Sequence, residues 1–112
     1  MSRRALTVPT LQILLSLAEG PRHGYGIKLD VEERTDGQLR LGSGTLYEAI
    51  QRLETNGWIV ESAPPTTGSV QEGTRFYRLT PQGREILTVE LGRLDAIVAH
   101  ARGLSLLPDR SG

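Results

Sequence analysis

Apolar residues recur at intervals of three and four near the start of the chain, and this spacing predicts helices. The first helix is expected from Val8 to Ala18, with Thr7 as its N-terminal cap and Pro9 in its first turn. We expect Gly20-Pro21 to end it, because proline cannot continue a helix and restricts the residue before it.

A second helix is expected from about His23 to Thr35, closed by the polar turn of residues 35–37. The residues expected on its inner face are Ile27, Leu29 and Val31. After it, Leu39 and Leu41 alternate with polar neighbours, a pattern that fits either a short strand or a loop.

A third helix is expected from about Gly44 to Asn56, with Ser43 as its cap and Gly57 beyond its end. Its apolar stripe consists of Leu46, Ile50 and Leu53. Two strand-like segments follow, and the Pro- and Gly-rich residues 64–74 between them are expected to form a loop. The strands are expected at Trp58 to Ala63 and Arg75 to Thr80.

Thr80-Pro81 has the cap-and-proline pattern of a helix start, and the helix after it is expected to reach about Arg102 or Leu104. Three helices, a hairpin and a long helix predict a mostly α protein with a small β-hairpin (α+β), a winged helix-turn-helix. We expect a winged helix-turn-helix DNA-binding domain at residues 1–80, a C-terminal dimerisation helix at 81–107 and a disordered tail at 108–112.

The last helix carries an apolar seam with the alternating four and three spacing of a coiled coil. The seam, which is the predicted homodimer interface, consists of Leu87, Leu91, Leu94, Val98 and Ala101. The alternative is that this helix folds back over the first helix of its own chain. A symmetric dimer accommodates both arrangements, with Arg3 and Arg4 near the interface.

The third helix is the candidate DNA-reading element, because the second helix of a helix-turn-helix motif lies in the major groove. At 100° per residue, the positions opposite its apolar stripe are Gly44, Glu48, Gln51 and Thr55. The DNA-binding candidates on the helix are Ser43, Gly44, Thr45, Tyr47, Gln51 and Arg52. Their N–H groups, hydroxyls and long polar side chains suit phosphates and base edges.

Each of these residues also has an ordinary structural explanation. Ser43 caps the helix, Tyr47 packs on the hairpin, and Arg52 pairs with Glu48 one turn earlier. Glu48 suits a DNA groove only where it meets a cytosine amino group or is neutralised by Arg52.

The second strand adds cations to the predicted wing. If Tyr77 and Leu79 point inward, Arg78 points outward and Arg75 lies at the loop end of the strand. Such arginines suit phosphates or a minor groove, although arginine on an exposed hairpin is also ordinary surface.

The chain resembles the PadR family of transcriptional regulators, in the short form with one C-terminal helix. The matching segments are Ile13–Leu15, Glu19–Tyr25, Glu33–Thr35, Gly44–Tyr47, Gln51–Glu54, Gly57–Ile59 and Tyr77–Arg84. The resemblance implies a dimeric regulator of double-stranded DNA, usually a repressor, that a small-molecule effector or another signal releases from its operator. It also implies DNA contacts from Thr45, Tyr47, Arg52, Arg75 and Arg78.

His23 and Tyr25 match the family's His-Gly-Tyr motif, where either a phosphate contact or a purely structural turn is expected. Some positions depart from the family pattern: Thr74 and Phe76 replace a cation and a second tyrosine, and Gly26 replaces a common acid. Residues 85–112 contain no aromatic residue, so a stacked planar drug is not expected there, and Trp58 is expected in the core.

Composition narrows the function classes. The 112 residues include no cysteine, which excludes disulfide scaffolds, cysteine zinc modules and thiol catalysis. No Ser–His–acid pattern, phosphate-binding glycine loop or metal-ligand spacing occurs, so we expect no enzyme, cofactor or metal. The chain has no apolar stretch long enough to span a bilayer and no signal-peptide pattern, so we expect a cytoplasmic protein without a membrane partner.

The balance of 13 basic and 13 acidic residues argues against bulk attraction to nucleic acid and leaves a protein-binding winged helix as the alternative function. The charges are unevenly placed, however. Residues 62–84 carry three cations and one acid, whereas residues 30–61 carry three cations and seven acids. We therefore expect placed contacts and modest non-specific affinity, with Glu48 and Glu54 as acids that the charge argument leaves unexplained.

Overall fold

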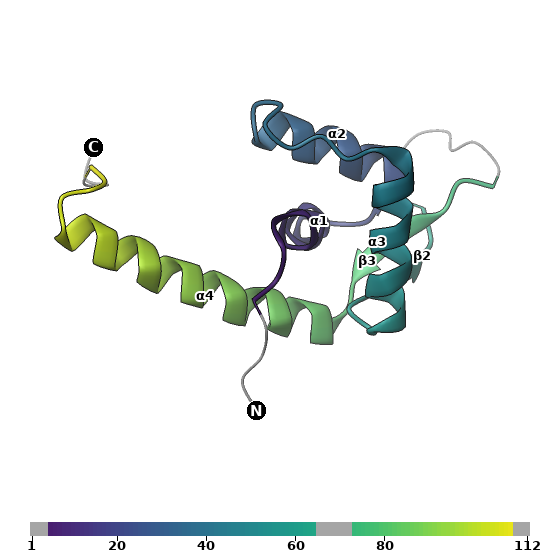
Figure 1. Cartoon of the computed structure of the whole chain (residues 1–112). Coiled ribbons are helices and arrows are strands. Elements are labelled where there is room, and N and C mark those ends of the chain that lie inside the picture. Colours follow the sequence, from purple (N-terminus) through teal and green to yellow (C-terminus); the bar gives the residue numbers. More distant parts are fainter. Residues whose placement is uncertain (1–4, 65–72, 109–112) are drawn as a thin grey trace.

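The computed structural model describes residues 5–64 and 73–108 (Figure 1). Its elements, in chain order, are α1 (Val8–Ala18), β1 (Arg22–His23), α2 (Gly24–Arg34), α3 (Ser43–Thr55), β2 (Ile59–Ser62), β3 (Phe76–Leu79) and α4 (Pro81–Gly103). The mostly α prediction with a small sheet is confirmed. Residues 65–72 of the expected loop, residues 109–112 of the expected tail, and Arg3 and Arg4 lie outside the described residues.

Helix α1 lies between α2 and α4 (Figure 1). The Thr7 hydroxyl accepts the Thr10 N–H at 3.3 Å, so the predicted cap is confirmed. The buried apolar residues of α1 are Ile13, Leu14 and Leu17, and they join a core shared with α2, α3, the sheet and α4.

Helix α2 begins one residue later than expected, because His23 is its cap. The His23 Nδ1 atom accepts the Gly26 N–H at 2.9 Å, and a Cβ at Gly26 would lie 3.3 Å from His23 Cε1. Ile27 and Val31 are buried as predicted, but the inward position of Leu29 is wrong, since its side chain is 45% exposed. Two residues advance a helix by about 200°, which turns Leu29 away from the face that Ile27 and Val31 share.

Helix α3 also differs from the prediction at its start. Gly42 is the cap without a side-chain hydrogen bond, and Ser43 is the first helical residue rather than the cap. The predicted end is confirmed, because Gly57 has a φ of +78° and Trp58 N–H donates to Leu53 C=O at 3.0 Å. The segment before α3 is a loop rather than a strand, although Leu41 is buried.

The sheet has three strands in the order β1-β3-β2, so the predicted two-stranded hairpin was incomplete. In β1, Arg22 pairs with Tyr77 and His23 pairs with Phe76, both antiparallel. Strands β2 and β3 are each one residue shorter at both ends than the predicted segments. In β3, Tyr77 is buried and Arg78 is exposed, as the alternation predicted.

Helix α4 is fixed to the domain at its start. The Thr80 hydroxyl donates to Gly57 C=O at 2.7 Å and accepts the Gly83 N–H at 3.0 Å, so the predicted cap is confirmed. A Cβ at Gly83 would lie 2.0 Å from the Trp58 carbonyl oxygen, which only glycine avoids. Ile86 is buried like Gly83, whereas the second half of α4 extends away from the other elements (Figure 1).

An ion-pair cluster holds α2 and β1 against α1. The Arg34 Nε atom donates to Asp30 at 2.9 Å, Arg34 Nη1 donates to Gln12 Oε1 at 2.6 Å, and Arg22 Nε donates to Ser16 C=O at 3.0 Å. Burial raises the pKa of Asp30, but the hydrogen bond from Arg34 and the charges of Arg34 and Arg22 outweigh it and leave the pKa below its ordinary value. Residues of this cluster therefore orient the helix that precedes α3.

Candidate nucleic-acid interface

The side of α3 that faces away from the core carries a continuous polar surface. Four of its side chains line one shallow, open hollow, and they are Glu48, Gln51, Arg52 and Thr55. The first turn is exposed as well, and it presents Ser43, Gly44 and Thr45. The helical arithmetic thus identified this face correctly, while Leu46, Ala49, Ile50 and Leu53 are buried on the other side.

Gly44 has no role in the packing of the described residues. A Cβ built at Gly44 would have no neighbour within 4 Å, and its backbone lies within a helix. Glycine inside a helix costs up to about 1 kcal/mol relative to alanine. A glycine here leaves the backbone of α3 open to close approach by another molecule.

Gly24 contrasts with Gly44, because it makes room for a side chain of α3. A Cβ at Gly24 would lie 2.8 Å from the Tyr47 hydroxyl oxygen. Tyr47 therefore packs against the start of α2 rather than on the hairpin, yet 53% of its surface stays exposed. The contact fixes the position of α3 relative to α2 and keeps the Tyr47 ring at the surface.

The His-Gly-Tyr segment is structural at its first residue and exposed at its last. Besides capping α2, the His23 ring meets the Phe76 ring edge-on, with centroids 5.3 Å apart. Tyr25 is 60% exposed, and Lys28 Nζ lies 5.9 Å from the centre of its ring. His23 thus joins α2 to β3, and Tyr25 places an aromatic ring and a cation together at the surface.

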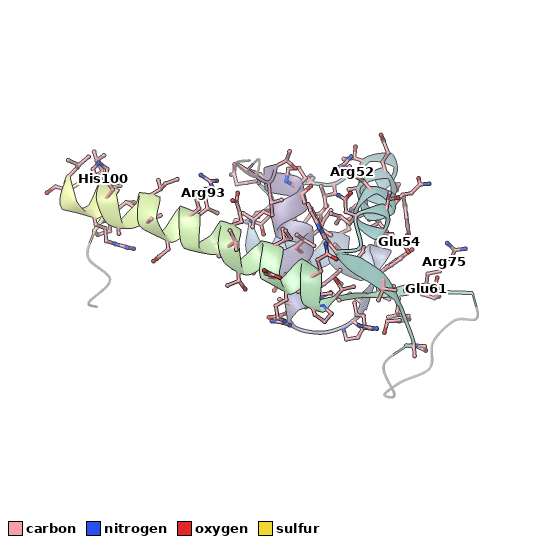
Figure 2. All side chains as sticks on the ribbon, turned by 90° about the horizontal axis from the view of Figure 1, so that it is seen from below. Arg52, Glu54, Glu61, Arg75, Arg93 and His100 are labelled. Atoms are coloured by element: carbon pink, nitrogen blue, oxygen red, sulfur yellow. The ribbon has the colours of Figure 1, made fainter. Side chains whose placement is uncertain are left out.

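The wing arginines differ in their surroundings. Arg75 Nε lies 3.5 Å from Glu61 Oε1, and both side chains are exposed. Arg78 is exposed opposite Val60 in the β2–β3 register and has no ion-pair partner among the described residues. Figure 2 shows Arg75 and Glu61 at the base of the wing.

Glu54 belongs to the hairpin side of α3 rather than to its outward face (Figure 2). Burial raises the pKa of the Tyr77 hydroxyl, and the nearby charge of Glu54 raises it further. One of the two unexplained acids of α3 therefore faces the sheet.

The predicted seam on α4 is divided by the fold. Leu87 is buried in the core of its own chain, where α4 packs on α1. Farther along, Leu91 is 38% exposed, and Leu94, Val98 and Ala101 are half-buried. The part of the seam not covered by the described chain begins at Leu91.

Glu90 is a feature that sequence analysis missed. Its buried carboxylate accepts the Leu6 N–H at 3.1 Å and both Arg93 Nε and Nη2 at 2.9 Å. The hydrogen bonds from Arg93 hold the pKa of Glu90 below its ordinary value despite the burial. No local pattern reveals this contact, because Leu6 and Glu90 are separated by 84 positions in the sequence.

Within the part of the chain that the structure describes, no helix is long and apolar enough to cross a membrane. Over the same residues, no three His, Asp or Glu side chains gather as metal ligands would.

Comparison with known families places this architecture among regulators. A family model described as the transcriptional regulator PadR-like family matches residues 13–89. The transcriptional regulator Rv3488 of Mycobacterium tuberculosis is 31% identical over 93 residues, which are 83% of this chain and 81% of that protein. An uncharacterised 37.1 kDa transposon protein of Streptomyces fradiae is 40% identical over 78 residues, which are 70% of this chain but only 20% of that protein.

Solved structures show the same arrangement. A transcriptional regulator from Clostridium thermocellum superposes with a TM-score of 0.68 at 28% identity, covering 85% of this chain and 87% of that one. A PadR family transcription regulator from Clostridium difficile has a TM-score of 0.69 at 22% identity, covering 88% of this chain and 98% of that one, which shows the shared fold.

Proposed function

Because the chain belongs to the PadR-like family of transcriptional regulators, we propose that it is a dimeric repressor that binds a specific operator in double-stranded DNA. The matched family consists of regulators rather than enzymes. We further propose that the repressor acts in the cytoplasm and leaves its operator in response to a small ligand or another signal.

The outward face of α3 is the observation that carries the proposal. Among the residues that the structure describes, the side chains of Ser43, Thr45 and Arg52 form no hydrogen bond, although each has donors to offer. With Gly44 open to close approach, these groups suit the base edges and phosphates of a major groove.

The wing supplies the second group of proposed contacts. Arg78 points away from the core of the sheet, and Arg75 extends from the wing base beside Glu61. In the proposed complex, both guanidinium groups lie against phosphates beside the groove that α3 enters.

Dimerisation through α4 gives the proposed repressor two reading heads. The apolar side chains of Leu91, Leu94 and Val98 lie on the part of α4 that extends from the domain (Figure 1). Pairing two such helices would bury these side chains and relate the two α3 helices by a two-fold axis, as a palindromic operator requires.

A planar drug stacked on α4 is not the signal that we expect, since residues 85–112 contain no aromatic residue. The proposed effector is therefore a non-stacking ligand or another signal that alters the α4 pairing.

Fluorescence anisotropy tests operator binding. A labelled duplex from the region upstream of the protein's own gene is titrated at moderate salt, beside a shuffled duplex of equal composition. We expect the upstream duplex to bind on the order of 10³-fold more tightly or better, and a Gln51→Ala, Arg52→Ala variant to lose most of this difference. Equal binding to every duplex would instead favour a winged helix that binds another protein.

A further inference from the structure

Glu48 is an acid at the centre of a surface that is proposed to face a polyanion. It lies in the second turn of α3, and it lines the outward hollow together with Gln51, Arg52 and Thr55. A carboxylate here repels phosphates, so its presence calls for a specific contact that offsets the repulsion.

Neutralisation by Arg52 does not account for Glu48. The spacing of four, with the acid first, is the favourable one for an ion pair on a helix. The described chain forms ion pairs of this spacing on α2, where Lys28 lies 2.9 Å from Glu32 and Arg34 lies 2.9 Å from Asp30. Among residues 5–64 and 73–108, Glu48 and Arg52 take part in no ion pair.

Contact with the rest of the fold does not account for Glu48 either. Glu54, the other acid of α3, lies close enough to Tyr77 to raise the pKa of that hydroxyl, whereas Glu48 is exposed on the opposite side from the core. The Glu48 side chain therefore stays available to an external donor.

The chemistry of the major groove selects that donor. An ionised carboxylate only accepts hydrogen bonds, so it needs an amino group on a base edge. Adenine places the N7 acceptor beside its amino group, and this acceptor repels a carboxylate. Cytosine presents its N4 amino group without such an acceptor.

We propose that Glu48 accepts a hydrogen bond from the N4 amino group of one cytosine in each operator half-site and thereby determines the base at that position. Arg52 lies about 6 Å farther along the helix, within reach of guanine O6 and N7 one or two base pairs away. This inference rests on the proposed operator binding and names the base that one residue of that site selects.

The test measures relative affinities of the dimer for every single-base variant of its selected operator. Wild type should prefer cytosine at one position of each half-site by roughly 5- to 150-fold over the other bases. Glu48→Ala should bring the four bases at that position within about twofold of each other and leave the other positions unchanged. Glu48→Gln should shift the preference to adenine, because glutamine pairs with adenine N6 and N7.

Glu33→Gln is the matched control, since it removes one exposed acid from α2 and leaves α3 intact. It should leave the preference at every position as in wild type. Circular dichroism verifies that each variant is folded, which the exposure of Glu48 leads us to expect.

The inference is overturned if Glu48→Ala binds every sequence more tightly by the same factor while the base preferences persist. That result would make Glu48 a source of repulsion only, with the proposed operator binding intact. A wild-type protein without any base preference would overturn both the inference and the proposed function, so the two failures are distinguishable.

Discussion

Single side chains carry the proposed contacts with DNA, and Arg78 is the simplest of them to isolate. It is exposed on β3, and it has no ion-pair partner in the described chain that its loss would disturb. Arg78→Ala should weaken binding to all sequences alike and reduce the slope of log K against log salt by about 1.

Anisotropy titrations at several salt concentrations measure this slope. Arg102→Ala, at the far end of α4, is the control and should keep the wild-type slope. A loss confined to one base pair of the operator would assign Arg78 to base reading instead.

Gly44 separates the needs of the fold from those of the interface. Because a Cβ at Gly44 meets nothing within 4 Å, Gly44→Ala should stabilise the fold by up to about 1 kcal/mol. The same methyl group should weaken operator binding, since it occupies the space through which DNA approaches α3.

Thermal unfolding and anisotropy on one sample check both effects. Gly92→Ala, which also meets nothing within 4 Å and is exposed on α4, should raise stability without changing DNA affinity. Unchanged operator affinity in Gly44→Ala would remove the first turn of α3 from the interface.

At the scale of elements, Glu90 links the start of α1 to α4. Its pKa is lowered in the folded protein, so its ion pair contributes stability above the ordinary carboxyl pKa, and this stability is lost as pH falls through the lowered value. Glu90→Gln keeps an acceptor for the Leu6 N–H but loses the charged contact with Arg93.

Urea unfolding between pH 7 and pH 3 should therefore show a smaller acid-induced loss of stability in Glu90→Gln than in wild type. The loss that remains in the variant is expected from Asp30, whose pKa is also lowered. Parallel pH profiles for the two proteins would show that the Glu90 pair contributes nothing.

Local patterns predicted the elements that depend on neighbouring residues. Thr7 and Thr80 were correctly read as caps, because each hydroxyl meets an N–H three positions later. The strand β1 was missed, since two residues have no periodicity and pair with β3 from a distant part of the chain. Ser43 was misread as a cap because the sequence alone does not show where the helical dihedral angles begin.

The candidate site divides in the same way. The outward residues of α3 followed from 100° per residue, and the structure adds what depends on packing: Tyr47 rests beside Gly24, and Glu54 faces Tyr77. Leu87 matched the seam by its spacing, but spacing does not distinguish a residue buried in its own core from one that faces a partner.

At the scale of the whole molecule, the proposed dimer depends on the exposed half of α4. Leu94→Asp should abolish dimerisation, because it places a charge in the middle of the apolar seam. Sedimentation velocity should then show a folded monomer at concentrations where wild type is a dimer. Ala96→Asp adds the same charge at an exposed position outside the seam and should remain dimeric. A folded Leu94→Asp dimer would exclude the seam as the interface.

The zero net charge of the chain also acts at this scale. The balance of 13 cations and 13 acids limits bulk attraction to phosphates, so the proposed specificity depends on placed contacts of α3 and the wing. Two copies of these contacts are needed for a tight complex, which ties DNA affinity to dimerisation.

Selection of binding sites from a random DNA library by the wild-type protein tests the central claim most directly. The proposed dimer predicts enrichment of one palindromic sequence whose half-sites lie one helical turn apart, about 10 base pairs, or a multiple of it. A selected pool without any common sequence would contradict operator binding by this protein.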